Sequence, residues 1–202
     1  MDPSQTALVL IGYQNDYFAA DGILHGVIEE SSSVTGVFAN TVNLIERLYS
    51  TLILVVSTPI VFTPDYSEIV DPVGILKAIK DVGAFKAGTK GAETVPELLR
   101  FGERIMEVSG KRGFNAFSNT DLDNLFRKRG ITHVVLAGVV TSICVDSTGR
   151  AAHERGYKVS ILSDCTSGRT IFEQNFYCEK VFPLYAEVID HVQLVRRLGI
   201  ES

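Results

Sequence analysis

The chain has 202 residues, of which 46% are hydrophobic and 21% charged, and its formal net charge at pH 7 is -5. This composition is typical of a globular protein with a large apolar core, and it fits one domain spanning residues 1–202. An acidic chain without a basic cluster is a poor partner for nucleic acid. No apolar run approaches the ~20 residues of a membrane span, and the first residues, MDPSQ, do not resemble a signal peptide. We therefore expect neither nucleic acid nor a membrane as partner.

The three cysteines, Cys144, Cys165 and Cys178, are odd in number and too sparse for a disulfide framework. Free thiols are typical of proteins that work in a reducing compartment. We therefore expect a cytoplasmic location.

Short apolar runs alternate along the chain with segments of helical periodicity. The runs that predict strands are residues 6–11, 52–56, 103–108, 133–137, 157–162 and 186–189. The segments that predict helices are residues 34–49, 95–100, 121–129, 144–155, 169–178 and 192–198. Residues 57–90 are rich in proline and glycine and predict a long excursion with at most a short helix near residues 73–79. Six strands with long crossovers predict an α/β fold, a three-layer α/β/α sandwich around a six-stranded, parallel, doubly wound sheet.

Cys144 lies in the turn between a predicted strand and the helix that follows it. Gly138 ends the apolar run, and Thr141 or Ser142 can cap the helix. The first turn of a helix presents unpaired N–H groups and a partial positive charge, which favour a thiolate over a thiol. Open parallel sheets also bind their ligands at this edge. Cys144 is therefore a candidate nucleophile, with a small buried packing residue as the alternative interpretation.

Three segments of the chain resemble the isochorismatase-like cysteine hydrolase superfamily: ALVLIGYQNDYF, GKRGFNAFSNTDL and GVVTSICVDSTGRAAHERGYKV. The resemblance extends over residues 7 to about 188 and implies a fold in agreement with the one predicted above. In the amidase members, an Asp after the first strand, a Lys in the middle loop and a Cys at the start of a helix form the catalytic triad. Lys111 matches the lysine and Cys144 the nucleophile, whereas Gly12 stands at the position of the Asp.

The resemblance implies that a C–N bond of a small amide, urea or carbamoyl compound is hydrolysed through a thioester intermediate. It assigns the oxyanion to the backbone N–H groups of Val140 and Cys144, and it implies a cis peptide bond between Val139 and Val140. Tyr17 and Phe117 flank the matched loops and are candidate walls of the substrate pocket. The resemblance also implies a homo-oligomer, either a dimer or a tetramer.

Gly12 has no side chain to accept the thiol proton, so we expect impaired catalysis. Three other groups are candidate bases. We interpret Asp16 as structural and Asp164 as a turn or cap residue, while removal of Lys111 from water favours its neutral amine form. We predict that Gly12→Asp raises kcat by about two to four decades with little effect on folding. The alternative function is a catalytically inactive relative that binds a small molecule or serves as a scaffold.

No metal or other cofactor is expected. Nicotinamidase-type members of the family bind a divalent ion through a D-x-H pair and a further histidine beyond the second strand, but the corresponding segment here, STPIVFTPDYSEI, contains no histidine. The histidines are scattered over different predicted elements, at His25, His133, His153 and His191. Isochorismate cleavage is disfavoured as well, because the members that perform it lack the cysteine. The metal-free amidohydrolase branch remains, with its exact substrate open.

Overall fold

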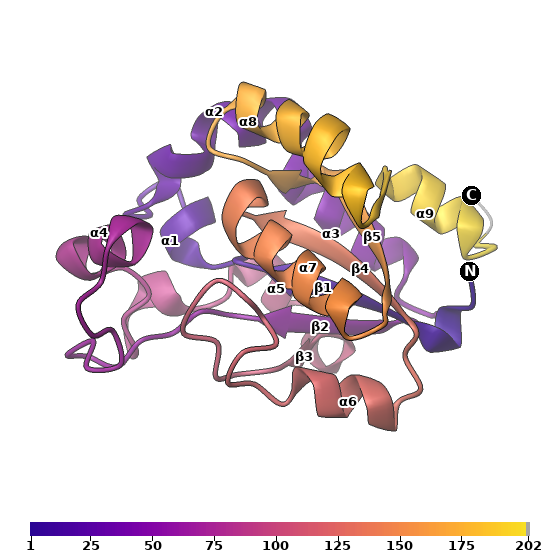
Figure 1. The fold of residues 1–202 in the computed structure, drawn as a ribbon, viewed down its shortest axis with the longest axis horizontal. Coiled ribbons are helices and arrows are strands. Elements are labelled where there is room, and N and C mark those ends of the chain that lie inside the picture. The colour runs from indigo at the N-terminus through magenta and orange to yellow at the C-terminus, as the bar shows by residue number, and fades with distance from the viewer. Residues whose placement is uncertain (201–202) are drawn as a thin grey trace.

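A six-stranded parallel sheet forms the centre of the fold (Figure 1). The computed structural model describes residues 1–200, and within them the strands lie in the order β3-β2-β1-β4-β5-β6. Chain order reverses between β1 and β4, so the carboxyl ends of these two strands form the switch point at which doubly wound sheets bind ligands. The strands are β1 (Thr6–Ile11), β2 (Leu54–Thr58), β3 (Met106–Glu107), β4 (His133–Val139), β5 (Lys158–Ser167) and β6 (Glu187–Ile189).

Helices cover both faces of the sheet, which confirms the predicted three-layer sandwich. On one face, Leu8 and Leu10 of β1 pack with residues of α3 (Val37–Arg47) and α9 (His191–Arg197). On the other face, Val9 of β1 packs with residues of α6 (Leu122–Lys128) and α7 (Asp146–Glu154), and α7 is drawn in front of the sheet in Figure 1. Alternate residues of a strand point to opposite faces, and a strand covered on both is apolar along its length, as β1 is.

A third apolar cluster lies at the carboxyl edge of the sheet, where α1 (Asn15–Phe18) meets the excursion after β2. The excursion contains one helix of two turns or more, α4 (Gly74–Val82), close to the predicted position. The remaining helices are α2 (His25–Thr35), α5 (Pro96–Leu99) and α8 (Ile171–Phe176).

The start of α1 holds the excursion against the sheet. The Gln14 amide donates to the carbonyls of Ile60 (2.9 Å) and Ala92 (2.7 Å) and accepts from the Ile60 N–H (3.0 Å). The buried Asp16 carboxylate accepts a hydrogen bond of 2.6 Å from the Phe85 N–H. Asp16 therefore has a structural role in holding the excursion, in agreement with its interpretation above.

The structure differs from the prediction mainly at element ends. The third strand is only two residues long because it is the edge strand and pairs with β2 alone. Helix α2 was missed because its three consecutive serines and two acidic residues break the apolar periodicity. The predicted helix 34–49 begins later, since Gly36 adopts a left-handed φ of 67° and separates α2 from α3. None of the helices within residues 1–200 is long and apolar enough to cross a bilayer.

Candidate active site

The register of the two central strands brings the residues after their carboxyl ends together. Ile11, the last residue of β1, lies opposite Gly138 of β4. A Cβ on Gly138 would lie 1.9 Å from the Ile11 carbonyl oxygen, so only glycine permits this approach. Gly12 and Val139 therefore lie side by side, and both line the same pocket.

Cys144 lines the same pocket from the first turn of the helix that follows β4. The peptide bond between Val139 and Val140 is cis, as the family resemblance implied. Thr141–Val145 form a π-helical turn, in which the Val140 carbonyl accepts hydrogen bonds from the N–H groups of Ile143 (3.1 Å) and Val145 (3.2 Å). Cys144 lies between these two donors in the chain, and its own N–H is not one of the two that bond to the Val140 carbonyl. Turns of this kind are frequent at functional sites, and periodicity in the sequence contains no signal for one.

Lys111 reaches the pocket from the loop between β3 and α6. Its side chain is 1% exposed, and its Nζ lies 3.6 Å from the Cys144 Sγ. Its backbone carbonyl accepts a hydrogen bond from the Val61 N–H (3.3 Å), which ties the loop to the excursion. The next side chain, Arg112, points outward and forms an ion pair of 3.0 Å with Glu68. Within residues 1–200, no carboxylate forms an ion pair with Lys111, so the thiol is its polar neighbour in the pocket.

The rest of the pocket is apolar and nearly filled. About 10 Å³ of space remains inside it, which is room for about one water molecule. No histidine or carboxylate lines it in the part of the chain that the structure describes. Apart from Gly12, Val139, Lys111 and Cys144, the lining residues are Tyr17, Ile60, Ile75, Ile79, Phe85, Phe114, Val140 and Ile143.

Tyr17, one of the two candidate walls, is buried and lines the pocket. Its ring packs against that of Phe85, with 5.1 Å between the centroids. Burial raises the pKa of the Tyr17 phenol, and the neighbouring Cys144 and Asp16 raise it further. Tyr17 therefore stays protonated and is not a base for the thiol.

The structure places Phe117, the second candidate wall, in the core and outside this pocket. Its ring stacks on that of Tyr157 at 6.1 Å in the core beneath α6, and it does not line the pocket. The Ala116 N–H donates to the buried Thr148 hydroxyl (3.1 Å), which turns this part of the loop toward α7. Phe114, three residues earlier in the same loop, lines the pocket instead.

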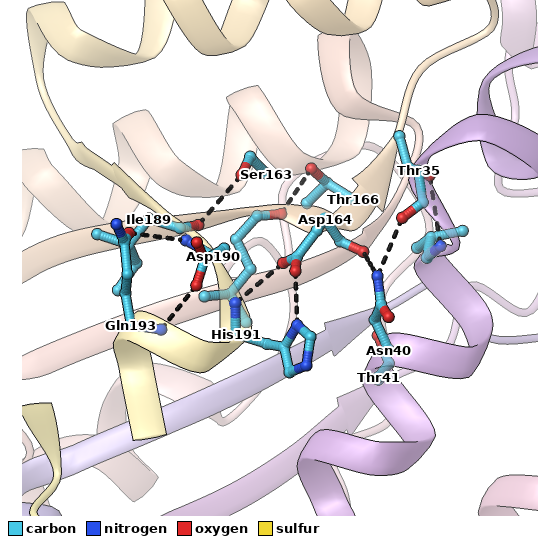
Figure 2. Close-up of polar contacts among 12 residues, drawn as sticks. Thr35, Asn40, Thr41, Ser163, Asp164, Thr166, Ile189, Asp190, His191 and Gln193 are labelled. Carbon is cyan, nitrogen blue, oxygen red and sulfur yellow. Dashed lines mark hydrogen bonds and ion pairs between the residues drawn. The ribbon is translucent and has the colours of Figure 1, made fainter. Parts of the chain in front are cut away.

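Asp164, one of the candidate bases, lies outside the pocket, within β5 where the pairing with β4 is irregular (Figure 2). One carboxylate oxygen accepts from the backbone N–H of His191 (3.0 Å), and the other lies 2.5 Å from the Nδ1 of the same residue. The Asp164 carbonyl accepts from the Asn40 amide (2.9 Å). Asp164 therefore links β5 to α9 and α3, in keeping with its interpretation as a cap, and it is not placed to take the Cys144 proton.

One cluster of potential metal ligands occurs among residues 1–200. One ligand atom each of Asp164, Cys165 and His191 lie within 4.8 Å of one another. Sequence spacing did not reveal this, because His191 belongs to another element. Both carboxylate oxygens already face His191, and burial raises the pKa of the Cys165 thiol, with Asp164 adding to the effect. These contacts account for the cluster as a helix cap, and it is separate from the pocket of Cys144.

The contact between a cysteine and a lysine at the switch point of a doubly wound sheet is the arrangement that the resemblance to cysteine hydrolases implies. The comparison with known families agrees: residues 6–193 match the family described as the isochorismatase domain. The chain therefore belongs to the isochorismatase family of hydrolases, as the resemblance in the sequence predicted.

Individual relatives agree with this assignment. A ureidoacrylate amidohydrolase, RutB, of Methylobacterium radiotolerans is 29% identical over 178 residues, which are 82% of this chain and 68% of that protein. A cysteine hydrolase of Pseudomonas syringae superposes with a TM-score of 0.82 at 19% identity, covering 98% of this chain and 94% of that one. An N-carbamoylsarcosine amidase of Thermoplasma acidophilum superposes with a TM-score of 0.71 at 23% identity, covering 93% and 96%. At these identities the two structures support the fold.

Proposed function

We propose that this chain hydrolyses a C–N bond of a small amide, urea or carbamoyl compound, with Cys144 as the nucleophile. The observation that carries the proposal is the 3.6 Å contact between the Lys111 Nζ and the Cys144 Sγ inside a buried pocket. The names of two proteins similar to this chain, ureidoacrylate amidohydrolase and N-carbamoylsarcosine amidase, support the same class of reaction.

Lys111 takes over the proton transfer that the missing carboxylate performs in the family. Gly12 has no acceptor, Tyr17 stays protonated and Asp164 is held by His191. The Lys111 amine accepts the thiol proton, and the thiolate attacks the carbonyl carbon. The resulting ammonium donates this proton to the departing nitrogen. Ammonia or an amine then leaves, and the acyl group stays on the Cys144 sulfur as a thioester.

Two backbone groups hold the oxyanion of the tetrahedral intermediate. The candidates are the N–H groups of Val140 and Cys144. The Cys144 N–H is supported by the π-helical turn, in which the N–H groups on either side of it donate to the Val140 carbonyl. In the second half of the reaction, Lys111 takes a proton from water and the hydroxide attacks the thioester carbon. The C–S bond breaks, Lys111 returns the proton to the Cys144 sulfur, and the free acid leaves.

Ammonia release from a panel of small amides and ureas tests the proposal. We expect Cys144→Ala to abolish release and Lys111→Met to lower kcat/KM by about 10²–10⁴-fold, the usual worth of general acid–base assistance. Arg112→Met is the matched control, because this neighbouring cation points away from the pocket toward Glu68. Activity that survives in Cys144→Ala, or is equal in Lys111→Met and Arg112→Met, would contradict the mechanism.

The alternative function is a binding protein without turnover, and Gly12 at the family's carboxylate position is the observation that favours it. Calorimetry with the same panel separates the two functions. Compounds that bind in the pocket but release no ammonia, with Cys144 intact and reactive, would support the binding protein over the enzyme.

A further inference from the structure

Among the described residues, the pocket of Cys144 contains no second cationic side chain that could pair with a substrate carboxylate. We infer that its ligand is a neutral amide or urea whose remaining part is a compact hydrocarbon group, without a carboxylate. The inference rests on the proposed function and adds the substrate class.

The charge balance of the pocket carries this inference. Lys111 is the one basic side chain that lines it within residues 1–200, and its Nζ contacts the Cys144 sulfur. A substrate carboxylate would lose its hydration on entry and would need a cation to offset that loss. Pairing with Lys111 would hold this amine in its protonated form, so it would no longer accept the thiol proton. A carboxylate ligand is therefore expected to inhibit.

The walls favour hydrocarbon. Ile60, Ile79 and Phe85 are buried walls. Ile75 of α4 and Phe114 retain solvent exposure, 36% for Phe114, so they border the mouth. The pocket now has about 10 Å³ of open space, so a hydrocarbon group enters only when these two side chains move aside. Apolar contacts at the walls and a few polar groups at the reacting atoms are the usual division of roles in a small-molecule site.

Matched substrate pairs test the inference. In 4-methylpentanamide and succinamate, and in isopentylurea and 3-ureidopropionate, an isopropyl group of the first compound is replaced by a carboxylate of similar shape in the second. We expect kcat/KM from ammonia release to be higher for the neutral member by at least about 100-fold, because its partner buries an uncompensated charge. A higher value for either carboxylate member would overturn the inference and leave the proposed function standing.

A cation added to the mouth should move this preference. Ile75→Arg is expected to reduce the ratio between neutral and carboxylate members by at least about 10-fold. Val82→Arg adds the same charge to the same helix, but Val82 is exposed and does not line the pocket, so the ratio should stay as in the wild type. An equal effect of both variants would indicate general charge attraction and would contradict a specific role of the pocket.

Alkylation of Cys144 measures the preference for neutral over charged ligands without any turnover of substrate. Iodoacetamide is neutral and iodoacetate carries a carboxylate, so the ratio of their alkylation rates with Cys144 should exceed the ratio in the unfolded chain by at least about 10-fold. If no compound of the panel releases ammonia while this ratio is high, the proposed function fails and the preference for neutral ligands stands. A ratio equal to or below that of the unfolded chain refutes the preference.

Discussion

The α-carbon of Gly12 packs directly against Val139, because a Cβ built on Gly12 would lie 2.9 Å from both the carbonyl oxygen and the Cγ2 of that residue. Gly12 also has a left-handed φ of 74°. Cβ atoms in proteins essentially never approach other atoms this closely, and side chains of L-residues rarely adopt such a backbone. The backbone after β1 is therefore shaped for glycine, and the site is more than a triad with one side chain removed.

This geometry corrects the expectation that Gly12→Asp leaves folding unchanged. We predict that Gly12→Asp and Gly12→Ala each lower the free energy of unfolding by about 1–3 kcal/mol, through the left-handed backbone and the contact with Val139. Urea unfolding measures the change. Gly26→Ala in α2 is the control, since a Cβ there meets nothing within 4 Å and alanine favours a helix by about 0.5–1 kcal/mol.

The same variant still tests the predicted gain in activity. A carboxylate at residue 12 restores a proton acceptor only if the backbone moves away from Val139. If folded Gly12→Asp shows no increase in kcat on any compound that binds, the missing carboxylate does not limit this enzyme. Gly12→Ala as stable as the wild type would contradict the backbone described for this position.

Alkylation should single out Cys144 of the three cysteines. Burial raises the pKa of the Cys165 thiol, and the nearby Asp164 carboxylate raises it further. Burial and the nearby Glu179 carboxylate raise the pKa of the Cys178 thiol to about 12. Neither therefore forms much thiolate near neutral pH, although Cys178 is more exposed than Cys144. Iodoacetamide labelling followed by peptide mapping is expected to modify Cys144 first. Faster labelling of Cys178 would show that exposure, and not thiolate character, controls the reaction.

Purified protein is expected to contain no stoichiometric zinc or iron and to keep its activity in a chelator. The pocket supplies one thiol and one amine but no imidazole or carboxylate within residues 1–200, and such a set does not hold a catalytic metal. Elemental analysis checks this. About one metal ion per chain, lost in His191→Ala, would show instead that the cluster with Asp164 binds a metal.

We predict a homo-oligomer, either a dimer or a tetramer. Phe172 (78% exposed) and Phe176 (46% exposed) of α8 stack on each other with ring centroids 6.1 Å apart, and Leu184 (79% exposed) follows a few residues later. Apolar side chains this large and this exposed favour an interface with a second copy. Light scattering at micromolar concentration should give a multiple of the chain mass, decreased by Phe172→Ser. A monomer in the wild type would contradict this prediction.

The six parallel strands, the position of Cys144 at a helix start and the interpretation of Asp164 as a turn or cap residue could be predicted from the sequence. These conclusions depend on local periodicity, capping residues and turn residues, which are properties of short segments. The structural interpretation of Asp16 came from the family resemblance. Which loop residues enter the pocket depends on tertiary contacts: Phe114 lines it, whereas Phe117 lies in the core. Tertiary contacts also bring Lys111 to Cys144 and His191 to Asp164. Loops have no repeating pattern, so the direction of each side chain is set by contacts with residues far away in the chain, which no short segment contains.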